Sequence, residues 1–218
     1  MAVGLPGRAE VPVGTGRLSL PGPARRGYGG TMRTLVSRAV APPEIAGVDS
    51  VLIRPIRTSD AASLERFYGA LSEESRRTRF FAVTRGLTSR QSAAFCATDH
   101  ACREGFVAIA GPDGAGARVV GHLCLEPGED HGAEMAVAVA DELQGRGIGR
   151  RLVEAGIVWA RAVGIQRLSA TMLATNTPIA RLVASLGLPT TRHPDEPDVL
   201  TVAVELQPPG APGLPRAA

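Results

Sequence analysis

Residues 133–163 read AEMAVAVA-DEL-QGRGIG-RRLVEAGIVWARAV. The first segment, Ala133–Ala140, is apolar except for one acid and carries valines that favour extended structure, so it predicts a buried strand. The last segment, Gly149–Val163, repeats apolar side chains at helical spacing and predicts an amphipathic helix. Between them lies Gln144–Gly149, with glycine at every second position. The order strand, glycine loop, helix places an adaptable backbone turn at a helix start.

The glycine loop predicts an anion site. Gly145, Gly147 and Gly149 allow backbone N–H groups to turn toward one point, because no Cβ stands in the way. The helix that follows adds the positive end of its dipole. Three arginines add mobile positive charge around the loop: Arg146, Arg150 and Arg151. We therefore expect the loop to bind a diphosphate.

Other glycine loops fit this sequence less well. A Walker loop ends in Gly-Lys-Ser/Thr, and all 24 basic residues here are arginine, which excludes it. A dinucleotide fold requires Gly-x-Gly-x-x-Gly and an acid about 20 residues further on. Here the spacing is Gly-x-Gly-x-Gly, and Gln166 and Arg167 stand in the downstream region. An ordinary glycine-rich turn is the remaining alternative.

The rest of the chain alternates strand and helix signals. Apolar runs predict strands at 51–56, 105–110, 119–125, 133–140, 167–174 and 199–206. Polar capping residues and helical spacing predict helices from Asp60 to about 71, at 72–79, at 88–98, at 149–163 and at 178–186. Gly111–Gly114 predicts a turn, so the second and third strands should form a hairpin. These elements indicate an α+β fold with a mixed sheet.

Composition divides the chain into three parts. Residues 1–48 predict a disordered N-terminal extension, because a start rich in Gly and Pro buries too little surface to offset its ordering entropy. Met32 offers an alternative start, in which case residues 1–31 are not translated. Residues 49–206 predict one folded domain, and residues 207–218 predict a flexible tail.

Charge and cysteines exclude several classes of partner. Residues 1–50 hold six arginines and three acids, which accounts for the net charge of +3, and residues 51–218 hold 18 of each sign. A neutral folded part gives no electrostatic footprint for nucleic acid, and no apolar run approaches the ~20 residues of a membrane span. Cys96, His100 and Cys102 match no zinc spacing, so we expect no metal. Three cysteines without a secretion signal indicate reduced thiols and a cytoplasmic protein.

Two motifs together resemble the GNAT acetyltransferases. Gln144–Gly149 matches that family's Gln/Arg-x-x-Gly-x-Gly/Ala signature, and Asn176–Leu188 resembles its Asn…Leu…Gly-Phe segment. The likeness spans about Val51–Leu206. It implies a mixed, mostly antiparallel central sheet flanked by helices, and acetyl-CoA as the co-substrate.

A narrower likeness is to the catalytic domain of the bacterial Pat-type protein lysine acetyltransferases. It rests on Ile53–Arg57, Leu71–Arg76 with Arg79–Phe81, and Ala133–Val137 before the loop. It implies a protein lysine as the acceptor, for example on a CoA-ligase-type enzyme. The alternatives are a small-molecule amine acceptor and a CoA-sensing module without catalysis.

The family resemblance implies roles for particular residues. The strand before the loop would part from its neighbour and pair its backbone with the pantetheine arm through Ala136, Val137, Ala138 and Val139. The loop residues Gln144, Gly145, Arg146, Gly147, Ile148 and Gly149, with Arg150, would hold the pyrophosphate. Asn176 would contact the CoA arm, and it also predicts an N-cap before Pro178.

Glu134 is the candidate general base. An acid has no packing reason to lie in an apolar strand, and partial burial would raise its pKa and suit it to take a proton from an amine. The alternative is that Glu134 is a strand-edge acid that faces solvent. Many family members place a Tyr seven residues after the Asn to protonate the leaving thiolate, but here that residue is Val183. This leaves solvent or Ser185 as the donor.

Overall fold

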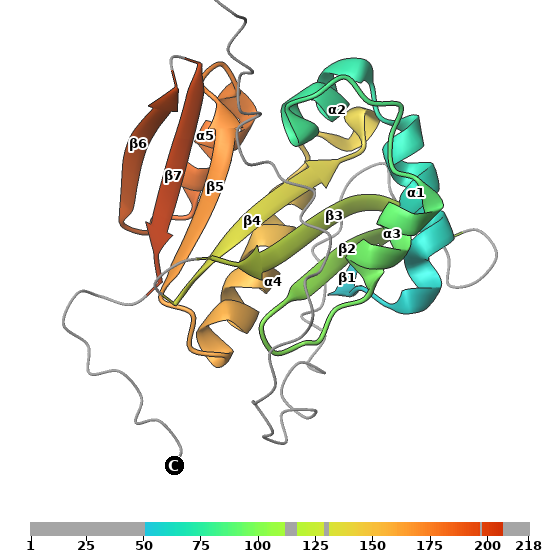
Figure 1. The fold of residues 1–218 in the computed structure, drawn as a ribbon, viewed down its shortest axis with the longest axis horizontal. Helices are drawn as coiled ribbons and strands as arrows, with labels where there is room; N and C mark the ends of the chain where they lie inside the picture. The colour runs from blue at the N-terminus through green and yellow to red at the C-terminus, as the bar shows by residue number, and fades with distance from the viewer. Residues whose placement is uncertain (1–50, 112–116, 129–130, 197, 207–218) are drawn as a thin grey trace, which may run out of the picture.

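The structure is a computed structural model that describes residues 51–111, 117–128, 131–196 and 198–206. Within them one sheet has the strand order β1-β2-β3-β4-β5-β7-β6 (Figure 1). The strands are β1 Val51–Pro55, β2 Glu104–Ala110, β3 Arg118–Pro127, β4 Gly132–Val139, β5 Arg167–Leu173, β6 Thr190–Glu196 and β7 Val199–Glu205. The helices are α1 Ala61–Ala70, α2 Glu73–Phe80, α3 Ser89–Cys96, α4 Ile148–Ala162 and α5 Thr177–Ser185, with short 3-10 turns η1 Thr58–Asp60 and η2 Asp141–Leu143.

The sheet confirms the predicted fold class. Neighbouring strands are antiparallel except β4 and β5, which are parallel. The predicted hairpin of β2 and β3 is present. Most of its expected turn, Gly111–Gly114, lies outside the described residues. The proposed boundaries of the extension and the tail also lie outside them.

Helices cover both faces of strands β2 to β4. Leu123 on β3 contacts α4, and a Cβ on Gly156 of that helix would come within 2.6 Å of Leu123 Cδ2, so glycine lets α4 lie close on the sheet. His122, the next residue back, points to the other face and contacts Tyr68 of α1. Because successive strand side chains alternate, α4 and α1 lie on opposite faces. The core is continuous across this layer.

Two local predictions were wrong. The Asp60 carboxylate does not cap α1; it accepts from both terminal nitrogens of Arg54 at 2.7 and 2.8 Å and from the Arg57 backbone N–H at 2.8 Å. No strand is predicted between residues 187 and 198, but Thr190–Glu196 forms edge strand β6. Its polar sequence with Pro194 has no apolar alternation, and an edge strand needs none.

The sheet forks between β4 and β5. The two strands pair only at their beginnings, where residues 132–134 face residues 167–169. Beyond Glu134, β4 continues to Val139 and β5 to Leu173 without pairing to each other. Figure 1 shows the two strands diverging from this point. The fork leaves a gap in the middle of the sheet, and the glycine loop lies at the end of β4.

Candidate active site

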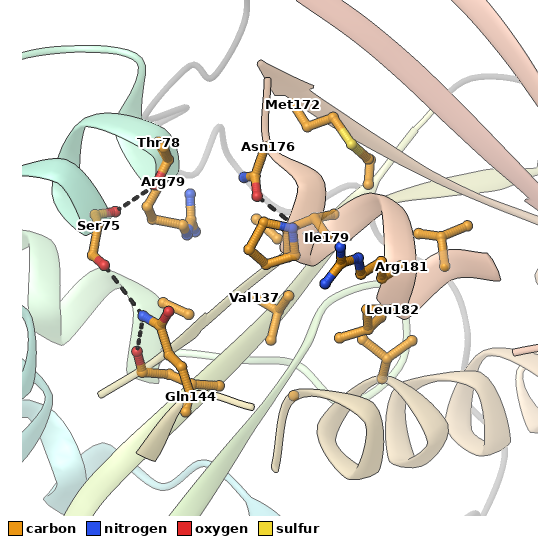
Figure 2. A pocket seen from close by; sticks show the side chains of 18 of the residues that line it. Ser75, Thr78, Arg79, Val137, Gln144, Met172, Asn176, Ile179, Arg181 and Leu182 are labelled. Atoms are coloured by element: carbon orange, nitrogen blue, oxygen red, sulfur yellow. Dashed lines mark hydrogen bonds between the residues drawn. The ribbon is translucent and has the colours of Figure 1, made fainter. Parts of the chain in front are cut away.

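A cavity of about 780 Å³ occupies the fork. That volume falls within the range of small-molecule sites. One wall, the loop wall, consists of β4 residues 136–139 and the cavity-lining residues of the following segment, which are 141, 143–145 and 147–150. The opposite walls come from α2, which we call the helix wall, and from β5 with α5. Figure 2 shows Arg79 of α2 and Arg181 of α5 entering the cavity from different elements.

Small side chains line β4 at the fork. Ala136, Val137, Ala138 and Val139 are all half-buried and all line the cavity. Their backbones pair with β3 on one side only, since the ladder to β5 has ended at Glu134. Main-chain groups on the edge toward β5 are therefore not used in the β4–β5 ladder.

The glycines of the loop serve two different purposes. Gly145 and Gly147 have φ of +74° and +80°, and a Cβ on either would meet nothing within 4 Å. The backbone conformation therefore favours glycine at these two positions, and the space above them is open. Gly149 is helical, and a Cβ there would lie 3.1 Å from Leu182 Cδ1, so it permits close contact between α4 and α5.

The start of α4 has the features of an anion site. The helix is 15 residues long and begins at Ile148, which is 1% exposed and anchors this end in the core. Its N-cap residue Gly147 supplies no capping side chain. The first N–H groups of the helix therefore have no side-chain acceptor at the cap, and they carry the positive end of the dipole. An anion is the natural complement of this arrangement.

The three arginines near the loop differ in position. Arg150 lines the cavity, and its Nε donates to Glu154 at 2.8 Å. Arg146 is exposed on the loop and does not line the cavity. Arg151 was expected beside the loop, and this prediction was wrong: its Nη2 donates to the backbone O of Val51 on β1, at 3.0 Å. Helical geometry turns consecutive residues to different sides.

Glu134 lies at the fork itself. It is the last β4 residue paired with β5, it is half-buried, and it lines the cavity. Glu126 of β3 stands directly opposite it in the register. Partial burial raises the pKa of Glu134, the charge of Arg79 lowers it, and Glu126 raises it again, leaving the pKa above its usual value. A raised pKa makes the carboxylate a stronger base than an exposed glutamate, as a proton acceptor requires.

Arg79 is a site residue to which the sequence gave no role. It lies near the end of α2, lines the cavity and acts electrostatically on Glu134. Its Nη2 donates to Cys124 Sγ at 3.2 Å, and its Nε is buried without a hydrogen-bond partner in the described structure. The only signal was its place in the Pat-like block Arg79–Phe81. Tertiary packing of α2 brings Arg79 to β4, so no local sequence pattern marks its role.

The end of α2 is conformationally strained. Phe81, which lines the cavity, has φ of +53°, an uncommon value for a bulky residue. The next two residues are exposed, and Val83 is 82% exposed. Strain of this kind is held in place by surrounding structure and is common at binding sites.

Helix α5 closes the far side of the cavity. Asn176 caps it, because its Oδ1 accepts from the Ile179 backbone N–H at 3.3 Å (Figure 2). This confirms the predicted N-cap, and Asn176 also lines the cavity. Val183 is 4% exposed and forms part of the apolar lining. Ser185 reaches the cavity too, but its hydroxyl donates to the Leu182 backbone O at 2.7 Å.

Cys96, His100 and Cys102, whose spacing matches no zinc site, do not gather around one point in the structure. Cys96 is buried and Cys102 exposed, and the His100 Nδ1 contacts Glu104 at 2.9 Å instead. In the described ranges no group of three His, Cys, Asp or Glu residues is arranged to hold a metal ion. None of the helices in these ranges has the length and apolar character to cross a membrane.

Comparison with known proteins identifies relatives of this architecture. The model of the acetyltransferase (GNAT) family matches residues 67–188. Acetyltransferase PA5475 of Pseudomonas aeruginosa is 31% identical over 150 residues, which cover 67% of this chain and 78% of that protein.

Solved structures of similar fold agree. The GNAT domain of S. lividans PAT superposes with a TM-score of 0.63 at 27% identity, over 71% of this chain and 90% of that one. The acetyltransferase yncA from Salmonella typhimurium, solved with its cofactor acetyl-CoA, has a TM-score of 0.59 at 20% identity, over 75% of this chain and 98% of that one. At that identity the second likeness concerns the fold.

Proposed function

Because the chain belongs to the acetyltransferase (GNAT) family, we propose that it moves an acetyl group from acetyl-CoA to a primary amine, most favourably a protein lysine. The observation that carries this proposal is the fork. It brings an open backbone edge, a glycine loop at a helix start and a carboxyl of raised pKa into one cavity.

The residues present fit acetyl-CoA. The open space above Gly145 and Gly147, next to the uncapped start of α4, suits a pyrophosphate. The edge of Ala136–Val139 that does not pair with β5 suits the amide groups of the pantetheine arm. Arg150 and Arg181, which are exposed and line the cavity, suit the remaining phosphate charge. Bound in this order, the thioester end would point toward Glu134.

The residues at the fork support direct transfer. The amine nitrogen attacks the thioester carbonyl, and Glu134 accepts the proton that the amine loses. The C–S bond then breaks and the thiolate leaves. The cavity gives this thiolate no Tyr at position 183, and the Ser185 hydroxyl is engaged with a backbone carbonyl. We therefore propose that solvent supplies the last proton, which yields the N-acetyl amine and free CoA.

A macromolecular acceptor is favoured by the shape of the helix wall. The exposed Ala82 and Val83 follow the cavity-lining Phe81, so an apolar contact surface borders the site. The likeness to the GNAT domain of S. lividans PAT supports the same acceptor class. A small amine would leave this border without a role.

Acetyl transfer can be tested by following free thiol. The protein is mixed with acetyl-CoA and one of three additions: none, a panel of small primary amines including a polyamine, or a CoA-ligase-type enzyme. We expect thiol release with the protein acceptor, and an acetylated lysine found by mass spectrometry. The sequence contains no lysine, so all acetyl-lysine belongs to the acceptor. Release only with small amines would overturn the lysine proposal, and binding without any release would indicate a CoA sensor.

A further inference from the structure

We propose that Asp141 is a positioning residue that couples the glycine loop to helix α2, so that CoA bound at the loop orders the helix wall. This inference rests on the proposed function, because it takes CoA as the ligand of the loop. Asp141 lies 69 positions after Ser72, the N-cap of α2, in the sequence. We call its hydrogen bonds to α2 the Asp141 bridge.

The Asp141 bridge consists of three short hydrogen bonds. The backbone N–H of Ser72 donates to Oδ2 at 2.8 Å, and the Ser72 hydroxyl donates to Oδ1, also at 2.8 Å. The hydroxyl of Ser75 donates to Oδ1 at 2.6 Å. Both oxygens of one carboxylate are therefore used on the first turn of α2, where a negative charge also complements the helix dipole.

A second contact runs directly from the loop. Gln144, the first residue of the glycine motif, donates from Nε2 to the Ser75 hydroxyl at 3.2 Å and to the Val139 backbone O at 3.2 Å. Figure 2 shows Ser75 and Gln144 facing each other at the lower edge of α2. The end of β4, the loop and α2 thus form one connected hydrogen-bond network.

Helix α2 buries little of its own surface. It has eight residues, and Phe80 is its only buried side chain. A helix of this length is marginal without external contacts. Its cavity face nevertheless carries Thr78, Arg79 and, just beyond its end, Phe81. A ligand that fixes the loop therefore fixes the position of these side chains, through Asp141.

The titration of Asp141 agrees with this geometry. Partial burial acts to raise its pKa, but the hydrogen bonds from Ser75 and Ser72 outweigh it and lower the pKa below its usual value. The carboxylate is thus ionised at neutral pH, when it binds α2 most strongly.

Hydrogen exchange with CoA as the probe tests the coupling. Exchange is measured in α2, residues 73–80, and in the loop with the start of α4, residues 144–151, with and without saturating CoA. In the unmodified protein we expect CoA to slow exchange in both segments, by about fivefold in α2, the lower end of typical coupling between sites. In Asp141→Asn we expect the loop to stay protected while the protection of α2 is lost.

Two further variants keep the result decisive. Glu142→Gln removes the adjacent charge, whose ion pair at 3.0 Å is with Arg118 on β3, and should retain both effects. Ser75→Ala breaks the network from the helix side and should lose most of the α2 protection, even if Asp141→Asn fails to bind CoA.

The outcomes separate the two proposals. CoA protection of α2 that persists in both Asp141→Asn and Ser75→Ala would overturn the coupling, since direct contact with CoA would then explain it. Protection of the loop alone in the unmodified protein would overturn it as well. If CoA protects neither segment, CoA binding itself is contradicted, and both proposals fall with it.

Discussion

The two walls of the cavity present different kinds of chemical group to a ligand. The loop wall uses main-chain groups, with glycines and small side chains that keep those groups accessible. The helix wall and the fork use long polar side chains, chiefly Arg79 and Glu134. Backbone groups recognise what every member of a cofactor family shares, whereas side chains can be exchanged to suit one acceptor. We therefore assign the donor to the loop wall and the acceptor to the helix wall.

The largest expected effect is on turnover at the fork. Glu134→Gln keeps the size of the side chain but removes the base, so we expect kcat to fall by about a hundredfold or more. Binding of CoA, which depends on the loop wall, should change little. Steady-state rates and a CoA titration on the same preparation measure both. Equal turnover in the variant at neutral pH would mean that Glu134 is not the base.

The stability of the folded protein should also depend on pH, through a histidine close to Arg79 of the helix wall. His122 is 0% exposed and packs against Tyr68 of α1 and Phe95 of α3, with Nδ1 2.9 Å from the Tyr68 hydroxyl. Burial, with repulsion from Arg79, lowers the pKa of His122 from 6.5 to about 3. The unfolded chain therefore gains a proton below pH 6.5 that the native state does not, and stability should fall by about 2 kcal/mol between pH 7.5 and 5.

The variant His122→Gln isolates this contribution. Denaturant unfolding of both proteins at the two pH values gives the difference, which cancels the acids and the other histidines. We expect the variant to be less stable at pH 7.5 but to lose less stability on acidification. Identical losses in both proteins would remove His122 from the explanation.

Two glycines with similar backbone conformation test whether the loop wall binds CoA. Gly147 has φ of +80° and Gly164, at the end of α4, has φ of +83°, and a Cβ would meet nothing at either position. Alanine at each should therefore cost a similar strain of about 1–2 kcal/mol. Only Gly147→Ala should also weaken CoA binding, by up to about tenfold, since relief of the same strain deforms the loop. Calorimetric titration with CoA distinguishes them; equal affinity in both variants would contradict the loop assignment.

The smallest expected effect is a displacement of the pH profile. Arg79 lowers the pKa of Glu134 against the opposing effect of burial. Arg79→Met should therefore raise that pKa further, and the acidic limb of the kcat profile should move to higher pH. Arg77→Met removes an exposed charge from the same helix and should leave the limb in place. A limb that moves equally in both variants would indicate a general charge effect.

The loop wall was predictable from sequence for a physical reason. Its signals are local: alternating glycines, a preceding apolar strand and one acid that packing cannot explain. The structure keeps those residues together because they lie within a few positions of one another on β4 and at the start of α4. The helix caps at Ser72, Thr88 and Asn176 could be predicted for the same reason, because each cap lies within a few residues of the helix that it begins.

The helix wall could not be predicted in this way. Arg79 reaches Cys124 of β3, and Asp141 reaches Ser72 at the start of α2, only through packing between segments more than 40 residues apart. The Asp60 carboxylate was mispredicted for a different reason: Arg54, only six residues earlier, binds it in place of the helix end. The sequence did not predict strand β6. A polar edge strand has no buried face, so its residues do not alternate between apolar and polar.

In the proposed mechanism the donor at the loop wall and the acceptor at the helix wall are bound at the same time. The acetyl group then passes directly between them, without an acetyl-enzyme intermediate. The alternative intermediate would be on Cys124, whose Sγ lies 3.7 Å from the Ala136 backbone O at the fork. Burial raises the pKa of Cys124, which keeps the thiol protonated and disfavours that path.

Rapid mixing with acetyl-CoA before any amine is added tests this claim most directly. We predict no release of thiol and no gain of mass by the protein until the acceptor is present, and then one thiol for each acetylated amine. A burst of thiol equal to the protein concentration, with acetyl found on the chain, would contradict it.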